Sequence, residues 1–103
     1  MAKEKYDGVV EAVHYTPDGE VDWVRTFLRR GPTFSDYILL DRQTLIEHLK
    51  AGKKFVVGRR IPQLASTFEI TRPVRVIDRD GREVLATGDL EPAQDNLDGV
   101  PRI

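Results

Sequence analysis

The order of apolar and polar positions predicts a β-hairpin at the start of the chain. Apolar and β-branched residues run from position 6 to 15 and again from 21 to 28, and Thr16-Pro17-Asp18-Gly19-Glu20 lies between the two runs. Pro17 favours the φ of a type I turn, and Gly19 can take the left-handed conformation of the bulge that follows such a turn. A hairpin with a three-residue loop is therefore expected here.

This hairpin is apolar on both faces. The loop sets the following pairs on one face: Val9 with Phe27, Val13 with Trp23, and Tyr15 with Val21, leaving Val10, Ala12, Val24 and Leu28 on the other. The first face also carries Glu11 opposite Arg25, and burying an ion pair in a core costs more than it returns. We therefore expect the first face to point outward, as an exposed apolar surface unless something covers it.

A short helix is expected in the middle of the chain. The apolar run 37–40 has the length of a strand, and the helix begins after it, with either Asp41 or Thr44 as the start of a capping pattern. Leu45, Ile46 and Leu49 form one apolar stripe, and Gly52 supplies the left-handed residue that commonly follows a helix. Because two or three turns do not persist alone, this helix must dock on the sheet.

Three further strands are predicted after the helix: 55–57, a run at 68–71 that resumes at 74–77, and the strand that follows the final hairpin turn. Pro73 interrupts the second of these, which argues for an edge or a bend rather than a central strand. The final hairpin turns at Asp78-Arg79-Asp80-Gly81. We favour a three-residue loop that sets Asp78 against Arg82, because a two-residue Asp80-Gly81 turn places like charges opposite each other.

These elements predict a mostly β, α+β fold with the order β-β-β-α-β-β-β and one short helix. The predicted architecture is a small, strongly bent sheet or a partly open β-barrel, and an open antiparallel sheet with the helix on one face is the alternative. Residues 1–88 are predicted to form a single small β-rich domain. Residues 89–103 are predicted to form an acidic C-terminal tail that its last apolar residues can pin in place.

Composition excludes several classes of protein. The 103 residues contain no cysteine, which rules out disulfides, thiolate nucleophiles and cysteine-ligated zinc. No stretch is apolar enough for a membrane span or a secretory signal, so a cytoplasmic location is expected. Arginine outnumbers lysine by 11 to 5, and Asn96 and Met1 are the only residues of their types, as in thermophilic proteins or in a GC-rich genome.

The net charge of −1 hides a segregation along the chain. Residues 1–40 carry −2, residues 41–77 carry +5 and residues 78–103 carry −4. A basic ledge is predicted where the helix end, the loop after it and the end of the second strand meet, and it suits phosphate groups. Its members are Arg29, Arg30, Lys53, Lys54, Arg59 and Arg60. Charged side chains that only flank buried strands are the alternative interpretation.

No catalytic, metal or cofactor site is predicted. His14 and Asp22 lie opposite each other in the hairpin, but nothing in the sequence brings Ser35 or Ser66, the only serines, to them. A cross-strand ion pair explains His14 and Asp22 without catalysis. An enzyme is therefore the weakest of three hypotheses.

The leading hypothesis is a non-enzymatic binding or accessory module. It uses Tyr15, Trp23 and Phe27 of the hairpin for a protein partner or for homodimerisation. This requires that Trp23 and Phe27 are not sealed inside the monomer. The alternative is a small nucleic-acid-binding β-barrel that acts through the basic ledge.

Overall fold

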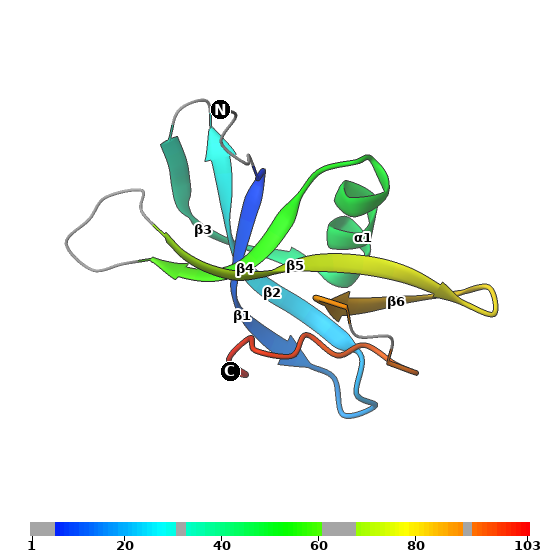
Figure 1. The fold of residues 1–103 in the computed structure, drawn as a ribbon. Coiled ribbons are helices and arrows are strands. Elements are labelled where there is room, and N and C mark those ends of the chain that lie inside the picture. The colour runs from blue at the N-terminus through cyan, green and yellow to red at the C-terminus, as the bar shows by residue number, and fades with distance from the viewer. Residues whose placement is uncertain (1–5, 31–32, 61–67, 90–91) are drawn as a thin grey trace.

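The chain folds into one six-stranded sheet with a helix packed against it (Figure 1). The computed structural model describes residues 6–30, 33–60, 68–89 and 92–103, with the backbone alone at 30, 33–36, 60 and 68. The elements are β1 (Gly8–Tyr15), β2 (Val21–Arg30), β3 (Thr33–Asp41), α1 (Arg42–Lys50), β4 (Phe55–Arg60), β5 (Phe68–Arg79) and β6 (Arg82–Thr87).

The order of the elements is as predicted, but their pairing is mixed. The strands lie in the order β3-β2-β1-β4-β5-β6, and β1 pairs with β4 in parallel while every other pairing is antiparallel. The direction follows from topology: β3 runs parallel to β1, and α1 returns the chain so that β4 starts at the same end. An all-antiparallel sheet is thus wrong at this one joint.

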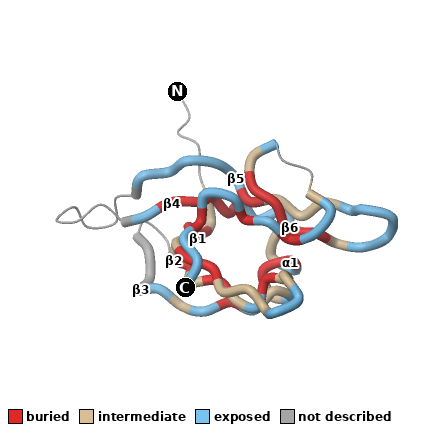
Figure 2. Tube along the Cα trace, turned by 90° about the horizontal axis from the view of Figure 1, so that it is seen from below, coloured by how far each residue is buried: buried red, intermediate tan, exposed pale blue. Residues whose placement is uncertain are grey.

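The sheet is open rather than a barrel. Among the described residues, its outer strands β3 and β6 do not pair with each other. Helix α1 contacts β2, β3 and β5 and lies between the two halves of the sheet (Figure 2). The helix therefore covers apolar surface that a closing pair of strands would cover in a barrel.

Helix α1 begins and ends where the sequence predicts. Of the two candidate starts, Asp41 is the N-cap, and its Oδ1 accepts a hydrogen bond from the N–H of Thr44 at 2.8 Å. Gly52 takes the left-handed conformation after the last turn, with φ of 90°. Leu45 and Ile46 are fully buried against the sheet.

The first hairpin has its predicted loop and shifts register by one residue in its middle. At the open end Val9 pairs with Phe27 as predicted, whereas further along Val13 faces Val24 rather than Trp23. The pair beside the turn is again as predicted. The predicted register is therefore correct at both ends and wrong between them.

Two β-bulges cause this shift. Glu11 is the extra residue in β1, and Asp22 is the extra residue in β2. Because an extra residue turns the following side chains to the other face, Val13 and Val21 lie in the main core, and their predicted outward placement is wrong. Both extra residues keep the ion pairs predicted for them, at 2.8 Å and 3.8 Å.

The core consists of two clusters on opposite faces of the sheet. The main cluster lies between the sheet and α1, and buried segments from both surround it in Figure 2. The smaller cluster, on the outer face, contains Val9, Phe27 and Val56 with Tyr6 packed against them. The hairpin is therefore apolar on both faces because it contributes to two cores.

The β5–β6 hairpin turns through two residues, so the predicted three-residue loop is wrong. Asp80 and Gly81 have φ of 56° and 84°, the conformation of a type I′ turn. This turn matches the right-handed twist of paired strands, and Asp-Gly is one of its preferred sequences. Two like-charged pairs flank the turn: Arg79–Arg82 and Asp78–Glu83.

The like charges are tolerated because other elements supply opposite charges. The carboxylate of Glu83 lies 2.7 Å from the ammonium of Lys50 in α1. The guanidinium of Arg82 lies 3.2 Å from the carboxylate of Glu20 beside the first hairpin turn. Tertiary partners therefore compensate the like charges that this two-residue turn places opposite each other.

Pro73 lies where β5 changes its pairing partner. Residues up to Val74 pair with β4, and residues from Val74 onward pair with β6. The Pro73 carbonyl accepts the N–H of Gly88 at 2.9 Å, so the Pro73 nitrogen points to the same side, just past the end of β6. Because proline has no N–H to donate there, the Gly88 carbonyl accepts the Nε–H of Arg75 at 2.6 Å. Pro73 therefore lies where no neighbouring strand needs its N–H, as at a sheet edge, although β5 continues through it.

The C-terminal segment, residues 92–103, packs onto the domain. Leu97 and Val100 are buried in the main core. The main chain of Val13 makes two hydrogen bonds of 2.9 Å to the last residues of the segment. It does so beyond the point where β4 stops pairing with β1. The segment thus completes the edge of β1 (Figure 1).

Asp95 anchors this segment. Its side chain is 1% exposed, and its two oxygens accept hydrogen bonds from the Val21 N–H (2.9 Å), the Leu85 N–H (3.0 Å) and the guanidinium of Arg42 (2.7 and 3.1 Å). Burial raises the pKa of Asp95, but the hydrogen bonds from Arg42 and the two backbone groups outweigh it, so the pKa lies below its usual value. One carboxylate therefore joins α1, β2 and β6.

Candidate functional site

The outer face of β2 and β3 carries the residues most relevant to protein contact. Cross-strand pairing places Phe27 beside Tyr37 and Arg25 beside Leu39. The Phe27 and Tyr37 rings meet edge to face at 6.4 Å, and the Arg25 guanidinium lies 5.1 Å from the centre of the Tyr37 ring. We call Trp23, Tyr37 and Leu39 the β2–β3 face.

The three aromatic residues predicted to bind a partner do not form one surface. Tyr15 packs against the main core, and its hydroxyl accepts the N–H of Leu97 at 3.0 Å. Phe27 is only 4% exposed and supports the outer cluster. Trp23 is partly exposed and stacks on His14 at 5.2 Å. The bulge at Asp22 separates Tyr15 from the other two.

Tyr37 and Leu39 are the two most exposed large apolar residues in the described part of the chain, and neither was predicted to bind a partner. Their exposed fractions are 55% and 56%. They alternate with Ile38 and Leu40, which face the main core. The run Tyr37-Ile38-Leu39-Leu40 is apolar on both faces, as the first hairpin is, so its sequence also predicts an apolar outer surface.

Part of the predicted basic ledge does assemble. The end of β2 and the loop after α1 meet at Asp7, whose N–H donates to the Lys54 carbonyl (2.7 Å) and whose carbonyl accepts the Arg29 N–H (2.8 Å). The Arg29 guanidinium donates to the Tyr6 carbonyl at 2.7 Å and lies 5.5 Å from the Tyr6 ring centre. Lys53 lies in the same loop, directly before Lys54, and is exposed.

The other predicted ledge residues lie elsewhere or outside the described side chains. Arg59 is near the opposite end of β4 from Lys54 and pairs with Glu69 at 3.0 Å. The side chains of Arg30 and Arg60 fall outside the described residues. The structure thus joins Arg29 and Lys54 but places Arg59 apart from them, and nucleic-acid binding stays a prediction.

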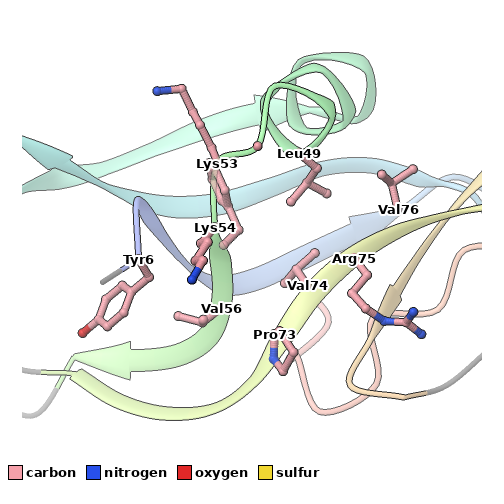
Figure 3. A pocket seen from close by; sticks show the side chains of 11 residues that line it. Tyr6, Leu49, Lys53, Lys54, Val56, Pro73, Val74, Arg75 and Val76 are labelled. Carbon is pink, nitrogen blue, oxygen red and sulfur yellow. The ribbon is translucent and has the colours of Figure 1, made fainter. Parts of the chain in front are cut away.

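A groove of about 440 Å³ lies beside Lys53 and Lys54, between the C-terminal end of α1 and β5 (Figure 3). Leu49 of α1 and Val74 and Val76 of β5 provide apolar walls. Its volume is within the range of small-molecule sites in proteins. The groove therefore has aliphatic walls, and Lys53 and Lys54 lie at its rim.

His14 forms the ion pair predicted for it. Its Nε2 lies 3.8 Å from the Asp22 carboxylate, and its Nδ1 lies 2.8 Å from the Ile103 main-chain oxygen. The side chains of Ser35 and Ser66 fall outside the described residues. In the described part of the chain, no three histidine, aspartate or glutamate side chains gather as metal ligands do.

Comparison with known proteins gives no assignment for this fold and its surfaces. No protein-family model matches the chain, and no curated protein or solved structure matches it significantly. Within the described ranges, no helix has the length and apolar character needed to cross a bilayer. The function of this protein must therefore be inferred from the surfaces described above.

Proposed function

We propose that this protein is a non-enzymatic binding module that dimerises through β3 and the β2–β3 face. The observation that carries the proposal is the exposure of Tyr37 and Leu39, two neighbouring apolar side chains on an outer strand. Together with the partly exposed Trp23, they continue the apolar outer face of β2. Contiguous apolar surface of this kind commonly marks a site of protein contact.

From Tyr37 to Asp41, beyond the register shift that precedes Tyr37, the edge of β3 lacks residue types that usually keep strands apart. Protein edges are commonly protected by lysine, proline, bulges or very short strands. Over 37–41, where its side chains are described, β3 has no lysine and no proline. Its single charge there, Asp41, caps α1. The outer edge of β3 is therefore suited to pairing with another strand.

A second copy of the chain fits this edge by symmetry. When two copies of β3 pair antiparallel about a two-fold axis, one residue of β3 must lie opposite its own copy at the axis. An axis at Ile38 sets Tyr37 of each copy against Leu39 of the other, so that both exposed side chains gain an apolar partner. An axis at Tyr37 gives a described apolar partner only to Tyr37, and an axis at Leu39 gives one only to Leu39.

Light scattering after gel filtration tests the proposal. The wild type should elute with twice the mass of one chain at high protein concentration and dissociate on dilution. Replacing Tyr37 and Leu39 together by serine should give a monomer with an unchanged circular dichroism spectrum, since both side chains are largely outside the core. Ile70→Ser is the matched control, because Ile70 is also an exposed apolar strand residue, 38% exposed, but lies on β5.

Two results would contradict dimerisation through β3. One is a wild type that stays monomeric at every concentration. The other is a dimer that Ile70→Ser weakens as much as the double variant does, because that would place the contact on β5.

A further inference from the structure

We infer that the groove between α1 and β5 binds a small amphipathic anion, a molecule with one carboxylate-type head and an aliphatic body. The inference is independent of dimerisation, because the groove lies beside α1 and β5 rather than on β3. It depends on the shape of the groove, the nature of its walls and the charge at its rim.

The walls of the groove are aliphatic and come from two elements. Leu49 extends from the last turn of α1, above Val74 of β5 (Figure 3). Leu49 and Val76 are only partly buried, so both keep apolar surface that a ligand can cover. An aliphatic chain of several carbons gains free energy by covering such surface, whereas a wholly polar ligand gains none.

The rim of the groove is cationic. Several described cations of this protein have a carboxylate beside them, including Lys50 with Glu83 at 2.7 Å and Arg72 with Asp98 at 3.0 Å. Lys53 and Lys54 differ: both are exposed, and neither has an ion-pair partner among the described residues. An anionic head group is the chemistry that these two ammonium groups lack.

The backbone of the rim is fixed by the start of β1. The Lys54 N–H donates to the Asp7 carboxylate at 2.8 Å, and the Lys54 carbonyl accepts the N–H groups of Asp7 and Gly8 at 2.7 and 3.2 Å. The Asp7 carboxylate is thus engaged with the main chain of Lys54. A loop held by three hydrogen bonds presents its side chains with less loss of entropy on binding.

The end of α1 does not supply anion-binding groups. The last carbonyls of the helix, of Glu47, His48 and Leu49, accept hydrogen bonds from the N–H groups of residues 51–53. A helix C-terminus repels anions, so the head group needs the cationic side chains that line the groove, which are Lys53, Lys54 and Arg75. Because Arg75 already donates to the Gly88 carbonyl, the site is expected to be sensitive to loss of the two lysine charges.

Nuclear magnetic resonance titration with octanoate tests the inference. Octanoate should shift the amide signals of Leu49, Lys54 and Val74, whereas acetate and octanol should shift them much less, because each has only half of the required chemistry. Replacing Lys53 and Lys54 together by glutamine should weaken octanoate binding by about tenfold or more. Lys50→Gln is the matched control, since this nearby lysine is engaged with Glu83, and it should leave the affinity unchanged.

Three outcomes would overturn the inference. Equal shifts with acetate would indicate ion binding at the surface only. Equal weakening by Lys50→Gln would indicate a general effect of charge. Saturable binding of a single-stranded oligonucleotide, lost in the same double variant and stronger than that of octanoate, would assign the lysines to nucleic acid instead. None of these results depends on the oligomeric state that light scattering measures.

Discussion

At the scale of single residues, Asp95 is the acidic side chain that the described part of the chain buries. Its carboxylate is buried and accepts hydrogen bonds from three elements. Removing one partner of such a pair leaves the other charge without compensation, which costs much more than a surface pair contributes. We expect Asp95→Asn to lower the free energy of unfolding by about 3 kcal/mol, measured by urea denaturation at pH 7.

The lowered pKa of Asp95 also predicts a dependence of stability on pH. A carboxyl group whose pKa is lower in the folded state stabilises the protein above its unfolded pKa, and this contribution is lost as the pH falls through the folded value. The stability of the wild type should therefore fall as the pH decreases below about 4, and Asp95→Asn should lack that part of the fall. Asp98→Asn is the control, because Asp98 makes only an exposed pair with Arg72. Equal losses in the two variants would contradict the role of Asp95.

Sequence reasoning did not find Asp95, for a physical reason. Residues 78–103 carry a charge of −4, and an acid in such a stretch is usually solvated. Its partners, Val21, Arg42 and Leu85, come from three distant parts of the chain and meet only in the finished fold. By contrast, the Asp41 cap depends on residues three positions apart and was predictable.

At the scale of elements, the β5–β6 hairpin shows that turn conformation outweighs cross-strand charge. Gly81 has φ of 84°, where a side chain costs about 1–2 kcal/mol, and Asp80 has φ of 56°, which asparagine accepts readily. We therefore expect Gly81→Ala to lower the free energy of unfolding by about 1 kcal/mol. Asp80→Asn should leave it nearly unchanged. Urea denaturation of both variants checks this, and a harmless Gly81→Ala would exclude the two-residue turn.

The first hairpin shows where prediction from alternation ends. Its turn, the Val9–Phe27 pair and its two apolar faces follow from residue type and spacing. The bulges at Glu11 and Asp22 do not, because a bulge depends on how the whole strand packs. Each bulge changes the face of the residues after it, which is why Tyr15 is separated from Trp23. Of the three aromatic residues expected to face outward, Trp23 is therefore partly exposed, whereas Tyr15 and Phe27 pack on the two cores.

At the scale of the whole molecule, local signals predicted the order of elements but not the joint between β1 and β4. The parallel pairing covers only Gly8–Val10, and β1 then needs another partner. The C-terminal segment provides it, together with Leu97 and Val100 in the main core. An acidic tail and a structural segment have similar compositions, and the difference between them lies in two apolar residues and one buried carboxylate.

This architecture predicts that the C-terminal segment is required for folding. A chain that ends at position 91 loses Asp95, Leu97 and Val100, and burying each apolar side chain is worth about 1.5–3 kcal/mol. Added to the loss of the Asp95 pair, this approaches the whole stability of a small domain, so the truncated chain should show no cooperative unfolding in urea. A chain that ends at Val100 keeps all three residues and loses the contacts that Val13, His14 and Tyr15 make with residues 101–103, so it should fold with a lower midpoint. If the shorter chain unfolded cooperatively at the wild-type midpoint, residues 92–103 would be a tail after all. Loss of the segment removes neither β3 nor the groove lysines from the chain. It should therefore affect dimerisation and ligand binding together, by unfolding the sheet that holds both surfaces.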